Sequence, residues 1–538
     1  MRHENFFYQN SQVTLRQAQG DLGVCLKGHH RRNKIIPKKP PQFRLIFRNS
    51  FLACEPSFLI IFSPKFLGVL LLHKIKSLKI SGVDCLPIIE GGKGVGVTTG
   101  VTAGHFAKAG AVGTFSGVNA DYIDENGNFI PLVYKTHTRR ERHEELIIDS
   151  IRGGISQAKI AHDISGGAGR IHMNVLWEMG GAERILHGIL DGAKGMIHGI
   201  TCGAGMPYRL AEIAEKYNVY YYPIVSSMRA FRALWKRSYH KAVTLLGGVV
   251  YECPWRAGGH NGLSNAEDPN AYEDPYPRVA EIRTFMNSVG LNEVPIIMAG
   301  GVWNLAEFDH WLDNPEIGPI VFQFGTRPIV TEEYPVPLAW KKKLLSLKEG
   351  DVYLNRFSPT GFYSSAVENE FIRELKGREI RQVEYRAKAA DNFTTEIPFG
   401  QRGRVVFIKP EDKAKVDSWI QAGHTEGMKT PDETLMFVDK SKAAQIVTDQ
   451  INCMGCLSQC RFSNWSDKEE MKYTTDRKAD PRSFCIQKTL QDVRKGIDIE
   501  NQLMFSGHSG YRFATDSFYD NGFIPTIQQL VDRIMAGK

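Results

Sequence analysis

Short runs rich in Val and Ile alternate with longer amphipathic stretches from Leu86 onward, and this alternation limits the fold more than any other feature of the chain. Such spacing implies parallel strands joined by crossover helices. From Leu86 to about Tyr334 the chain spans roughly 250 residues, the usual length of a (β/α)8 barrel. Eight strands are predicted, at 86–89, 111–115, 170–176, 195–200, 219–225, 247–252, 294–298 and 319–324.

The predicted fold class is therefore α/β, a (β/α)8 TIM barrel over residues 80–340. Amphipathic stretches at 208–216 and 278–288 are predicted barrel helices. The long gap at 119–145 contains the turn signal Asp124-Glu125-Asn126-Gly127, which predicts a small hairpin over the barrel mouth.

Residues 341–538 are too many for a trailing helix. With predicted helices at 365–376 and 409–421, they are expected to form a mostly helical C-terminal subsidiary domain that packs against the barrel. Residues 1–79 are expected to lie outside the folded part. Apolar residues within 1–74 do not recur with the strand period of 2 or the helix period of 3.6, and the first strand is predicted only after Ile80.

The net charge of +8 belongs to one end of the chain. Residues 1–74 carry 12 Lys or Arg and 3 acids, so 55 basic and 56 acidic residues remain in the rest. This neutral body argues against a nucleic-acid or membrane-surface partner. The apolar run 57–72 is broken by Pro64-Lys65, so it is too short to span a membrane and starts too late for a secretory signal. A disordered extension or a misassigned start is favoured over a targeting or membrane-binding role.

The nine cysteines are an odd number, and no secretory signal precedes them, so a disulfide framework is not expected. The predicted location is the cytoplasm.

Glycines follow the predicted strands at the end where a TIM barrel builds its active site. A residue without Cβ lets backbone N–H groups approach a ligand, although each glycine alone is also compatible with a tight turn. The loops after strands seven and eight, Ala299-Gly300-Gly301 and Gln323-Phe324-Gly325-Thr326, predict a site for a phosphorylated ligand. The other glycines of this kind are Gly91, Gly92, Gly94, Gly96, Gly203, Gly205, Gly258 and Gly259.

Four motifs resemble, in order and spacing, the nitronate monooxygenase family, also called the 2-nitropropane dioxygenase family. They are PIIEGGKGVG at 87–96, AGGHNG at 257–262, AGGV at 299–302 and QFGT at 323–326. Two later segments, Ser358-Pro359-Thr360-Gly361 and Ala366-Val367-Glu368-Asn369, look like the family's post-barrel segment. The resemblance thus covers the barrel and continues beyond it.

The resemblance implies an FMN-dependent (β/α)8 oxidoreductase. It implies a phosphate site, a first glycine-rich loop along the isoalloxazine ring, and an asparagine that hydrogen-bonds the flavin. The phosphate residues would be Gly300, Gly301, Gly325 and Thr326 with Gln323 beside them, and the ring-side residues Gly91, Gly92, Lys93, Asn174, Gly258 and Gly259.

Three residues depart from the family pattern. Glu90 and Lys93 stand where the family more often has Gln and Met, and Cys253 stands where many members have a flavin-contacting Gln. Lys93 could stabilise an anionic reduced ring or could point to solvent. These changes bear on the substrate more than on the cofactor.

His260 is the candidate catalytic base. An unperturbed imidazole has a pKa near 6.5, so its neutral form is available at about neutral pH to take a proton from carbon beside a nitro group. In the family the histidine of this motif has that role, while the alternative is a capping or structural histidine. His172 and His198 lie within or near predicted strands and are expected to be packed or to line the pocket.

Cys453, Cys456 and Cys460 form a C-x2-C-x3-C array, with Cys485 as a possible fourth thiolate. Soft thiolates at this spacing favour an iron–sulfur cluster, with [4Fe-4S] ahead of zinc. The array is similar to the cluster-binding run of flavin reductases of the dienoyl-CoA reductase type, although there the fourth Cys follows sooner. The alternative is three buried small residues at the spacing of one helix turn.

The leading hypothesis is a nitronate monooxygenase that oxidises alkyl nitronates, or nitroalkanes deprotonated by His260, with O2 to a carbonyl compound and nitrite. The alternative flavoenzyme is an NAD(P)H-dependent reductase of enoyl thioesters or quinones. A flavin-free phosphosugar isomerase and a binding or scaffold protein are the hypotheses from other classes. A small-molecule substrate and O2 are thus the expected partners, and the sequence does not predict an oligomeric state.

Overall fold

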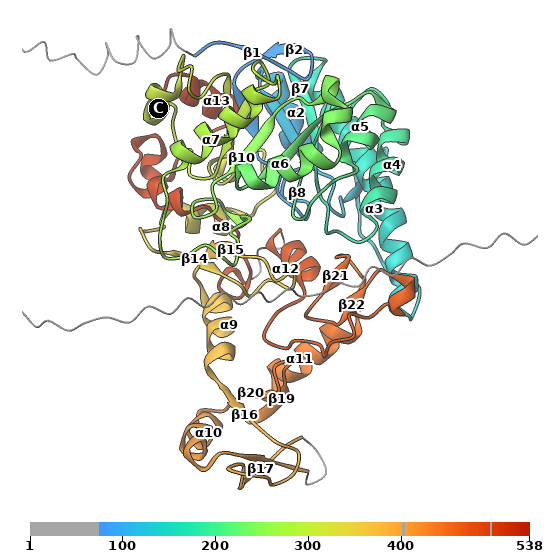
Figure 1. The fold of residues 1–538 in the computed structure, drawn as a ribbon, viewed down its shortest axis with the longest axis vertical. Coiled ribbons are helices and arrows are strands. Elements are labelled where there is room, and N and C mark those ends of the chain that lie inside the picture. Colours follow the sequence, from blue (N-terminus) through green and yellow to red (C-terminus); the bar gives the residue numbers. More distant parts are fainter. Residues whose placement is uncertain (1–74, 401–403, 495, 497) are drawn as a thin grey trace, which may run out of the picture. The chain divides into compact units, whose positions relative to one another are not determined.

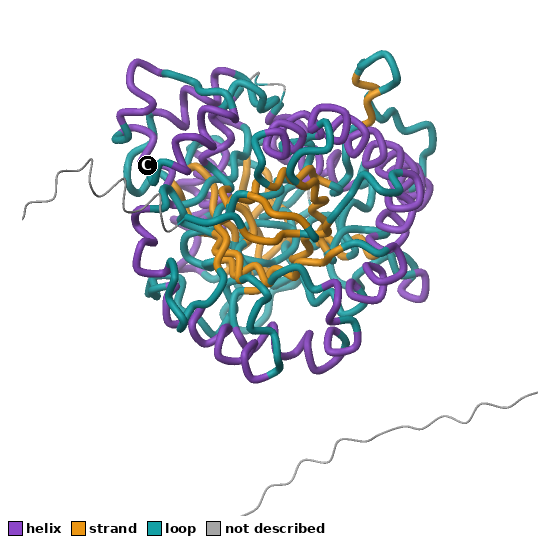
Figure 2. Tube along the Cα trace, turned by 90° about the horizontal axis from the view of Figure 1, so that it is seen from above, coloured by secondary structure: helices purple, strands orange, loops and turns teal. Residues whose placement is uncertain are grey.

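Eight parallel strands close into a barrel in the computed structural model, which describes residues 75–400, 404–494, 496 and 498–538. The strands lie at the centre of a ring of helices (Figure 2), so the predicted (β/α)8 fold class is confirmed. Around the barrel their order is β10-β12-β13-β3-β4-β7-β8-β9. Their bounds are β3 (Ile88–Glu90), β4 (Val112–Ser116), β7 (Arg170–Leu176), β8 (Gly199–Gly203), β9 (Tyr220–Val225), β10 (Val249–Glu252), β12 (Ile296–Ala299) and β13 (Ile320–Phe324).

Each predicted strand overlaps one of these. The largest displacement is in the fourth, predicted at 195–200, because Gly195 adopts a left-handed φ of 81° and turns the chain before β8 begins.

Helices connect most of the strands. The longest, α3 (Arg139–Ser165), begins where Thr138 and Glu141 form a capping box and ends at Gly166 in a left-handed conformation. Between β12 and β13 the connection is the 3-10 helix η3 (Ala306–Trp311). The remaining barrel helices are α2 (Gly100–Lys108), α4 (Ala182–Gly192), α5 (Leu210–Tyr217), α6 (Met228–Arg237), α7 (Pro275–Ser288) and α8 (Leu338–Leu345).

A short hairpin, β1 (Leu78–Ile80) and β2 (Val83–Cys85), closes the barrel at its N-terminal end. Its turn residue Ser81 hydrogen-bonds His172 Nε2 at 2.9 Å and the Tyr222 hydroxyl at 2.8 Å through its own hydroxyl. The expectation that the first strand comes only after Ile80 was therefore wrong. Strands of three residues are too short to show the alternation of apolar and polar residues by which a strand is recognised. The prediction for residues 1–74 lies outside the described residues.

The predicted hairpin within 119–145 is present as β5 (Tyr122–Ile123) and β6 (Phe129–Ile130). Asp124 shapes its turn by accepting hydrogen bonds from the N–H groups of Asn126 and Asn128.

After α8 the chain alternates helices with four small antiparallel sheets. The helix predicted at 365–376 is only partly right, because β15 occupies its first residues and the helix starts after Asn369, which caps it. The helix predicted at 409–421 is confirmed as α10. The elements are β14 (Val352–Asn355), β15 (Ser364–Val367), α9 (Glu370–Ile380), β16 (Gln382–Glu384), β17 (Thr395–Pro398), β18 (Val405–Ile408), α10 (Lys413–Gln421), β19 (Glu426–Lys429), β20 (Thr434–Val438), α11 (Lys440–Ile451), β21 (Gln459–Cys460), β22 (Trp465–Ser466), α12 (Ile486–Val493) and α13 (Ile527–Met535).

Residues 382–438 form an insertion with a small hydrophobic core of its own, separate from the barrel core. Its two ends meet, since Phe437 N donates to Arg381 O at 2.9 Å and Arg381 Nε donates back to Phe437 O at 2.9 Å. In Figure 1 its elements lie at the end of α9 away from the barrel, while β14, β15 and α12 lie between α9 and the barrel.

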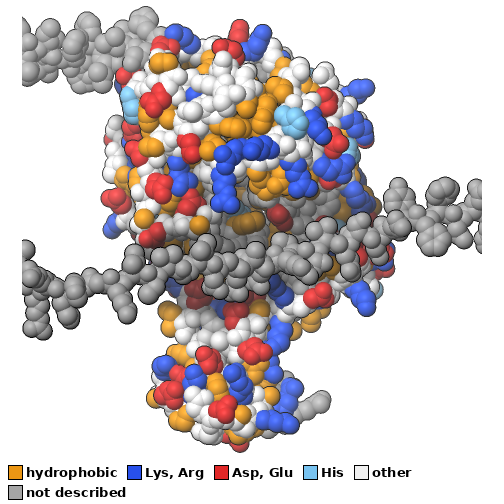
Figure 3. Space-filling view, viewed as in Figure 1, with side chains coloured by type: hydrophobic (Ala, Val, Ile, Leu, Met, Phe, Trp, Pro, Cys, Tyr) orange, Lys and Arg blue, Asp and Glu red, His pale blue; other side chains and the backbone are white. Residues whose placement is uncertain are grey.

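Acidic and basic side chains are interspersed on the face shown in Figure 3, as the neutral composition of the body predicts. Among the helices in the described ranges, none is both long and apolar enough to cross a membrane.

The packing of α2 on β4 requires a residue without a side chain at Gly113. A Cβ there would lie 1.8 Å from the Ala103 carbonyl oxygen. We expect Gly113→Ala to lower the free energy of unfolding by more than about 3 kcal/mol, since backbone must move to relieve the overlap. Gly127→Ala, where nothing lies within 4 Å but φ is +82°, should cost only about 1–2 kcal/mol. Chemical denaturation of both variants tests this, and equal losses would contradict it.

Candidate functional site

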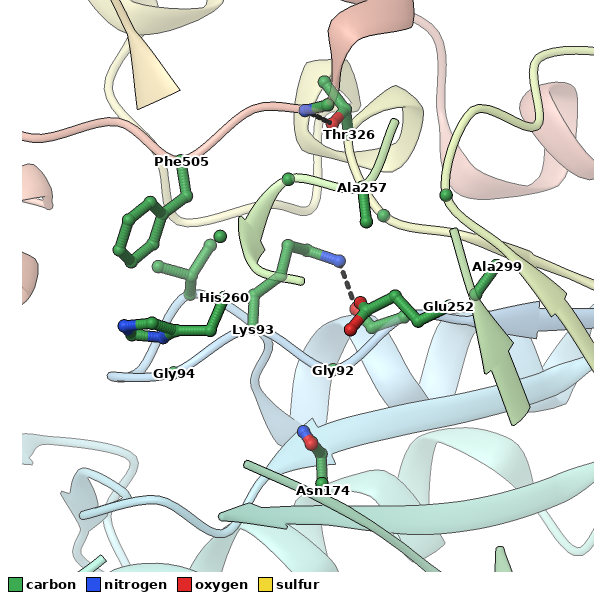
Figure 4. A pocket seen from close by; sticks show the side chains of 18 of the residues that line it. Gly92, Lys93, Gly94, Asn174, Glu252, Ala257, His260, Ala299, Thr326 and Phe505 are labelled. Carbon is green, nitrogen blue, oxygen red and sulfur yellow. Dashed lines mark hydrogen bonds between the residues drawn. The ribbon is translucent and has the colours of Figure 1, made fainter. Parts of the chain in front are cut away.

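A cavity of about 230 Å3 opens at the carboxyl ends of the barrel strands. All twelve residues predicted for the cofactor and for catalysis line it, although they come from the ends of five different barrel strands. They are Gly91, Gly92, Lys93, Asn174, Gly258, Gly259, His260, Gly300, Gly301, Gln323, Gly325 and Thr326. Figure 4 shows several of them around the cavity.

One end of the cavity is lined by bare backbone. Gly300 and Gly301 have φ of 84° and 86°, which side chains rarely adopt, and a Cβ at Gly325 would meet nothing within 4 Å. The C-terminal segment completes this end, because Gly507 N donates to Thr326 Oγ1 at 2.8 Å and Ser509 Oγ donates to Gly301 O at 3.1 Å. Exposed N–H groups of this kind favour an anion such as a phosphate.

Asn174 lies at the other side of the cavity, directly against Gly92. A Cβ at Gly92 would come within 2.2 Å of Asn174 Cβ, so only glycine fits there. The buried Asn174 Oδ1 accepts no hydrogen bond from the protein. An unsatisfied buried acceptor costs about 1–3 kcal/mol, which a ligand with an N–H donor would offset.

Lys93 faces the cavity and not solvent. Its Nζ donates to Gly91 O and lies 5.1 Å from the centre of the Tyr334 ring. Burial lowers the pKa of Lys93 to about 8, with the nearby Glu90 carboxylate opposing the change.

Glu90 is fully buried beneath the loop. Thr114 N donates to it at 2.9 Å and the Tyr334 hydroxyl at 2.5 Å. Burial raises the pKa of Glu90, although Lys93 and these hydrogen bonds act in the opposite direction.

Glu252 is a cavity residue that the sequence did not single out. It is the last residue of β10, and burial alone raises the pKa of its carboxyl to about 8. The carboxyl therefore carries a proton at neutral pH and can donate a hydrogen bond. Its position after a Val-Val-Tyr strand is the only signal that could have pointed to it.

His260 is positioned by strand pairing. It lies in β11 (Gly259–His260), which pairs antiparallel with β15 so that His260 is opposite Ser364. The His260 Nε2 atom lies 2.6 Å from Ser358 Oγ, and Ser358 Oγ lies 2.8 Å from Thr360 Oγ1. Both hydroxyl residues belong to the post-barrel segment named by the resemblance.

Burial lowers the pKa of His260 to about 4. The imidazole is therefore neutral over a wider pH range than an unperturbed histidine. Ser358 can donate to Thr360 while it accepts from Nε2–H, which leaves the Nδ1 lone pair for a proton from a ligand. The second neighbour of the ring is Phe505, at a centroid distance of 5.5 Å.

Glu90, Gly96 and Gly205 do not line the cavity, and neither do His172, His198 and Cys253. His172 is fully buried beside the β1–β2 hairpin, and His198 Nδ1 accepts from Ile171 N at 3.0 Å, so both are packed residues. Cys253 is also fully buried, and burial raises the pKa of its thiol.

Several cavity residues lie far along the chain from the barrel. Met504, Phe505, Gly507 and Ser509 come from the C-terminal segment. Arg256 also lines the cavity, but it lies within the barrel sequence, directly before the Ala257-Gly258-Gly259 motif. The small-residue run Ser506-Gly507-His508-Ser509-Gly510 was a sequence signal for close approach that went unused.

The four predicted metal ligands lie in the C-terminal part, and Cys456 also lines the cavity. Cys453 and Cys456 are in the loop after α11, so the cysteines do not have the spacing of a helix turn, although Cys453, Cys456 and Cys460 are all buried as the alternative expected. In the described part of the chain, no group of three or more His, Cys, Asp or Glu side chains is arranged around a single metal ion.

In TIM barrels the active site lies at the carboxyl ends of the strands, which is where this glycine-lined cavity opens. Residues 173–459 match a family model described as nitronate monooxygenase. The match covers more than half of the chain, and the chain belongs to this family of oxidoreductases.

Solved structures of similar fold include FabK from Thermotoga maritima, nitroalkane oxidase from Streptomyces ansochromogenes, and the enoyl reductase domain of MlnA from the macrolactin biosynthesis cluster of Bacillus amyloliquefaciens. FabK is 16% identical, with 57% of this chain and 76% of FabK covered and a TM-score of 0.39. The nitroalkane oxidase is 16% identical, with coverage of 54% and 79% and a TM-score of 0.37. The MlnA domain is 11% identical, with coverage of 84% and 93% and a TM-score of 0.42. Identities and scores this low say nothing of the substrate, and no curated protein matches the chain.

The depressed basicity of His260 can be measured directly. We expect its imidazole to take up a proton only as the pH falls through about 4, because no carboxylate offsets the cost of burying the cation. An NMR titration with labelled histidine, assigned by comparison with His260→Asn, gives the midpoint. A midpoint near 6.5 would contradict the environment described for this ring.

Proposed function

We propose that the protein is an FMN-dependent nitronate monooxygenase, which oxidises alkyl nitronates or neutral nitroalkanes with O2 to a carbonyl compound and nitrite. The observation that carries the proposal is that His260, a neutral base, faces the same cavity as the bare backbone of the loops after β12 and β13.

The cavity fits FMN on two counts. The open space at Gly325 and the left-handed Gly300 and Gly301 leave N–H groups accessible to a phosphate, and Asn174 Oδ1 lacks a donor that a flavin ring N–H would supply. Gly300, Gly301, Gly325 and Thr326 would hold the phosphate, with Gln323 beside it. Gly91, Gly92, Lys93, Asn174, Gly258 and Gly259 would line the ring.

FMN, when bound, supplies the electron-accepting chemistry that the side chains of the standard amino acids do not provide. The work of the protein is to bind and deprotonate the substrate beside it. His260 accepts the proton from the carbon next to the nitro group, and Ser358 holds the imidazole in place. The imidazolium that forms has no carboxylate beside it, so the negative charge of the nitronate is its stabilising partner.

Lys93 favours the binding of an anionic substrate. Its ammonium group lies at the cavity wall and is mostly protonated at neutral pH, since its pKa is about 8. A positive charge at this position attracts a nitronate, whose oxygens carry the negative charge.

Glu252 favours a second candidate function, an NAD(P)H-dependent reductase of enoyl thioesters or quinones. Such a reduction needs a proton as well as a hydride, and the protonated Glu252 carboxyl lines the cavity. Rapid anaerobic bleaching of the flavin by NADH or NADPH would favour the reductase. Slow bleaching by both, with rapid bleaching by an alkyl nitronate, would favour the monooxygenase.

The phosphate end can be tested by filling the open space at Gly325. Gly325→Asp should fold, because its Cβ meets nothing within 4 Å, but it should lose FMN since a carboxylate would repel the phosphate. Gly325→Ala is the matched control and should keep most of the flavin. Flavin absorbance per chain after gel filtration is the measurement, and full FMN in the Asp variant would contradict the assignment.

The base can be tested with paired substrates. His260→Asn should reduce kcat/KM for a neutral nitroalkane by about 10²- to 10⁴-fold, the usual contribution of a positioned base. It should affect the preformed nitronate far less, because that substrate has already lost its proton. His162→Asn, on the exposed end of α3, is the control, and flavin content should be unchanged in both variants.

Equal kinetics of wild type and His260→Asn on both substrates would remove His260 from the mechanism. If the wild type accepts only nitronates, the role of His260 is reduced to binding the anion.

A further inference from the structure

Four cysteines gather in the part of the chain that follows α11, and the proposed oxidation uses none of them. Cys453 and Cys456 lie in the loop after α11, Cys460 ends β21, and Cys485 is the residue before α12. All four are free thiols, and the first three are buried. Each lies within electrostatic reach of at least two of the others. We refer to these four residues as the cysteine cluster.

Every sulfur of the cysteine cluster accepts a hydrogen bond. Ser463 Oγ donates to Cys453 Sγ at 3.0 Å and Gly455 N at 3.4 Å. Backbone N–H groups donate to the other three sulfurs, and the donors are Gln487 to Cys456, Phe462 and Ser463 to Cys460, and Lys488 to Cys485. A neutral thiol is a weak acceptor, whereas hydrogen bonds to sulfur are characteristic of thiolates that bind iron–sulfur clusters.

Two of these donors belong to the first turn of α12. The N–H groups of a first helical turn have no partner within the helix, and the helix dipole there favours negative charge. This turn contacts Cys456 through Gln487 and Cys485 through Lys488, although burial raises the pKa of both thiols.

Contacts from α3 and from Gly180 hold the backbone of the loop that carries Cys453 and Cys456. Buried Arg142 on α3 donates to Cys453 O at 3.2 Å and to Ile451 O at 2.8 Å. His143 Nδ1 lies 2.9 Å from Gly455 O, and Gly180 N donates to Cys456 O at 3.0 Å. These contacts hold the backbone between the cysteines without using their side chains, as a ligand site requires.

The arrangement of the four thiols argues against a single metal ion. Zinc needs its four ligands around one atom, and the described residues contain no such arrangement. In a [4Fe-4S] cluster each thiolate binds a different iron, so the four sulfurs surround a larger volume.

We propose that Cys453, Cys456, Cys460 and Cys485 bind a [4Fe-4S] cluster in the wall of the active-site cavity. Cys456 and Leu457 line the cavity, and so do Ile486, Gln487 and Leu490 of α12. The proposal does not depend on the identity of the substrate, because it rests only on the thiols, their donors and their place in the wall.

The test uses the full-length protein purified without oxygen. We expect about four iron atoms and four acid-labile sulfides per chain, and an electron paramagnetic resonance signal from a cluster after reduction with dithionite. Cys456→Ser should lose iron, sulfide and signal while it keeps its fold. Cys85→Ser, which changes a buried thiol at the opposite end of the barrel, should keep all three.

Cys485 is the least buried of the four, so Cys485→Ser replaces Cys456→Ser if the latter does not fold. One zinc per chain without sulfide would overturn the proposal, and so would a protein that takes up neither iron nor sulfide in anaerobic reconstitution. Equal iron loss in Cys85→Ser and in the cluster variants would show that the iron is bound elsewhere. Failure of the nitronate assay with iron and sulfide intact would contradict only the proposed function.

Discussion

The close approach of Gly258 to the backbone of Ser506 and Gly507 determines how the C-terminal segment meets the barrel. A Cβ at Gly258 would lie 2.6 Å from Gly507 N and from the Ser506 carbonyl carbon, so no other residue permits this contact. From it follow the hydrogen bond of Gly507 to Thr326, the position of Phe505 beside His260, and the contact of Ser509 with Gly301. Both ends of the cavity therefore depend on a contact between residues nearly 250 positions apart.

The barrel could be predicted from the sequence because its signals are local. Each strand shows its own Val and Ile run, and the glycines that line the cavity follow those runs directly, so His260 and the eleven predicted cofactor residues fall in one place. Phe505 and Ser509 were not predicted as cavity residues: the small residues at 506–510 indicate a close approach, but the local sequence does not show that the approach is to the ends of the barrel strands. Glu252 was missed for another reason: the sequence does not show that its carboxyl is buried. The short β1–β2 hairpin was missed because strands of three residues carry no period.

The cavity contains two groups that change charge in the same pH range. Lys93 loses its positive charge as the pH rises through about 8, and Glu252 gains a negative charge over the same interval. The two changes have the same sign, so they lower the charge of the cavity together. An anionic ligand is therefore held more weakly above this range than below it.

The insertion at 382–438 begins and ends at one pair of hydrogen-bonded residues, Arg381 and Phe437. Most of its core is separate from that of the barrel, but Met436 and Val438 of β20 pack into the larger core, and Arg482 pairs with Asp432. The strand β20 therefore anchors the insertion, and the loops beyond it are the part whose length can change at little cost in free energy.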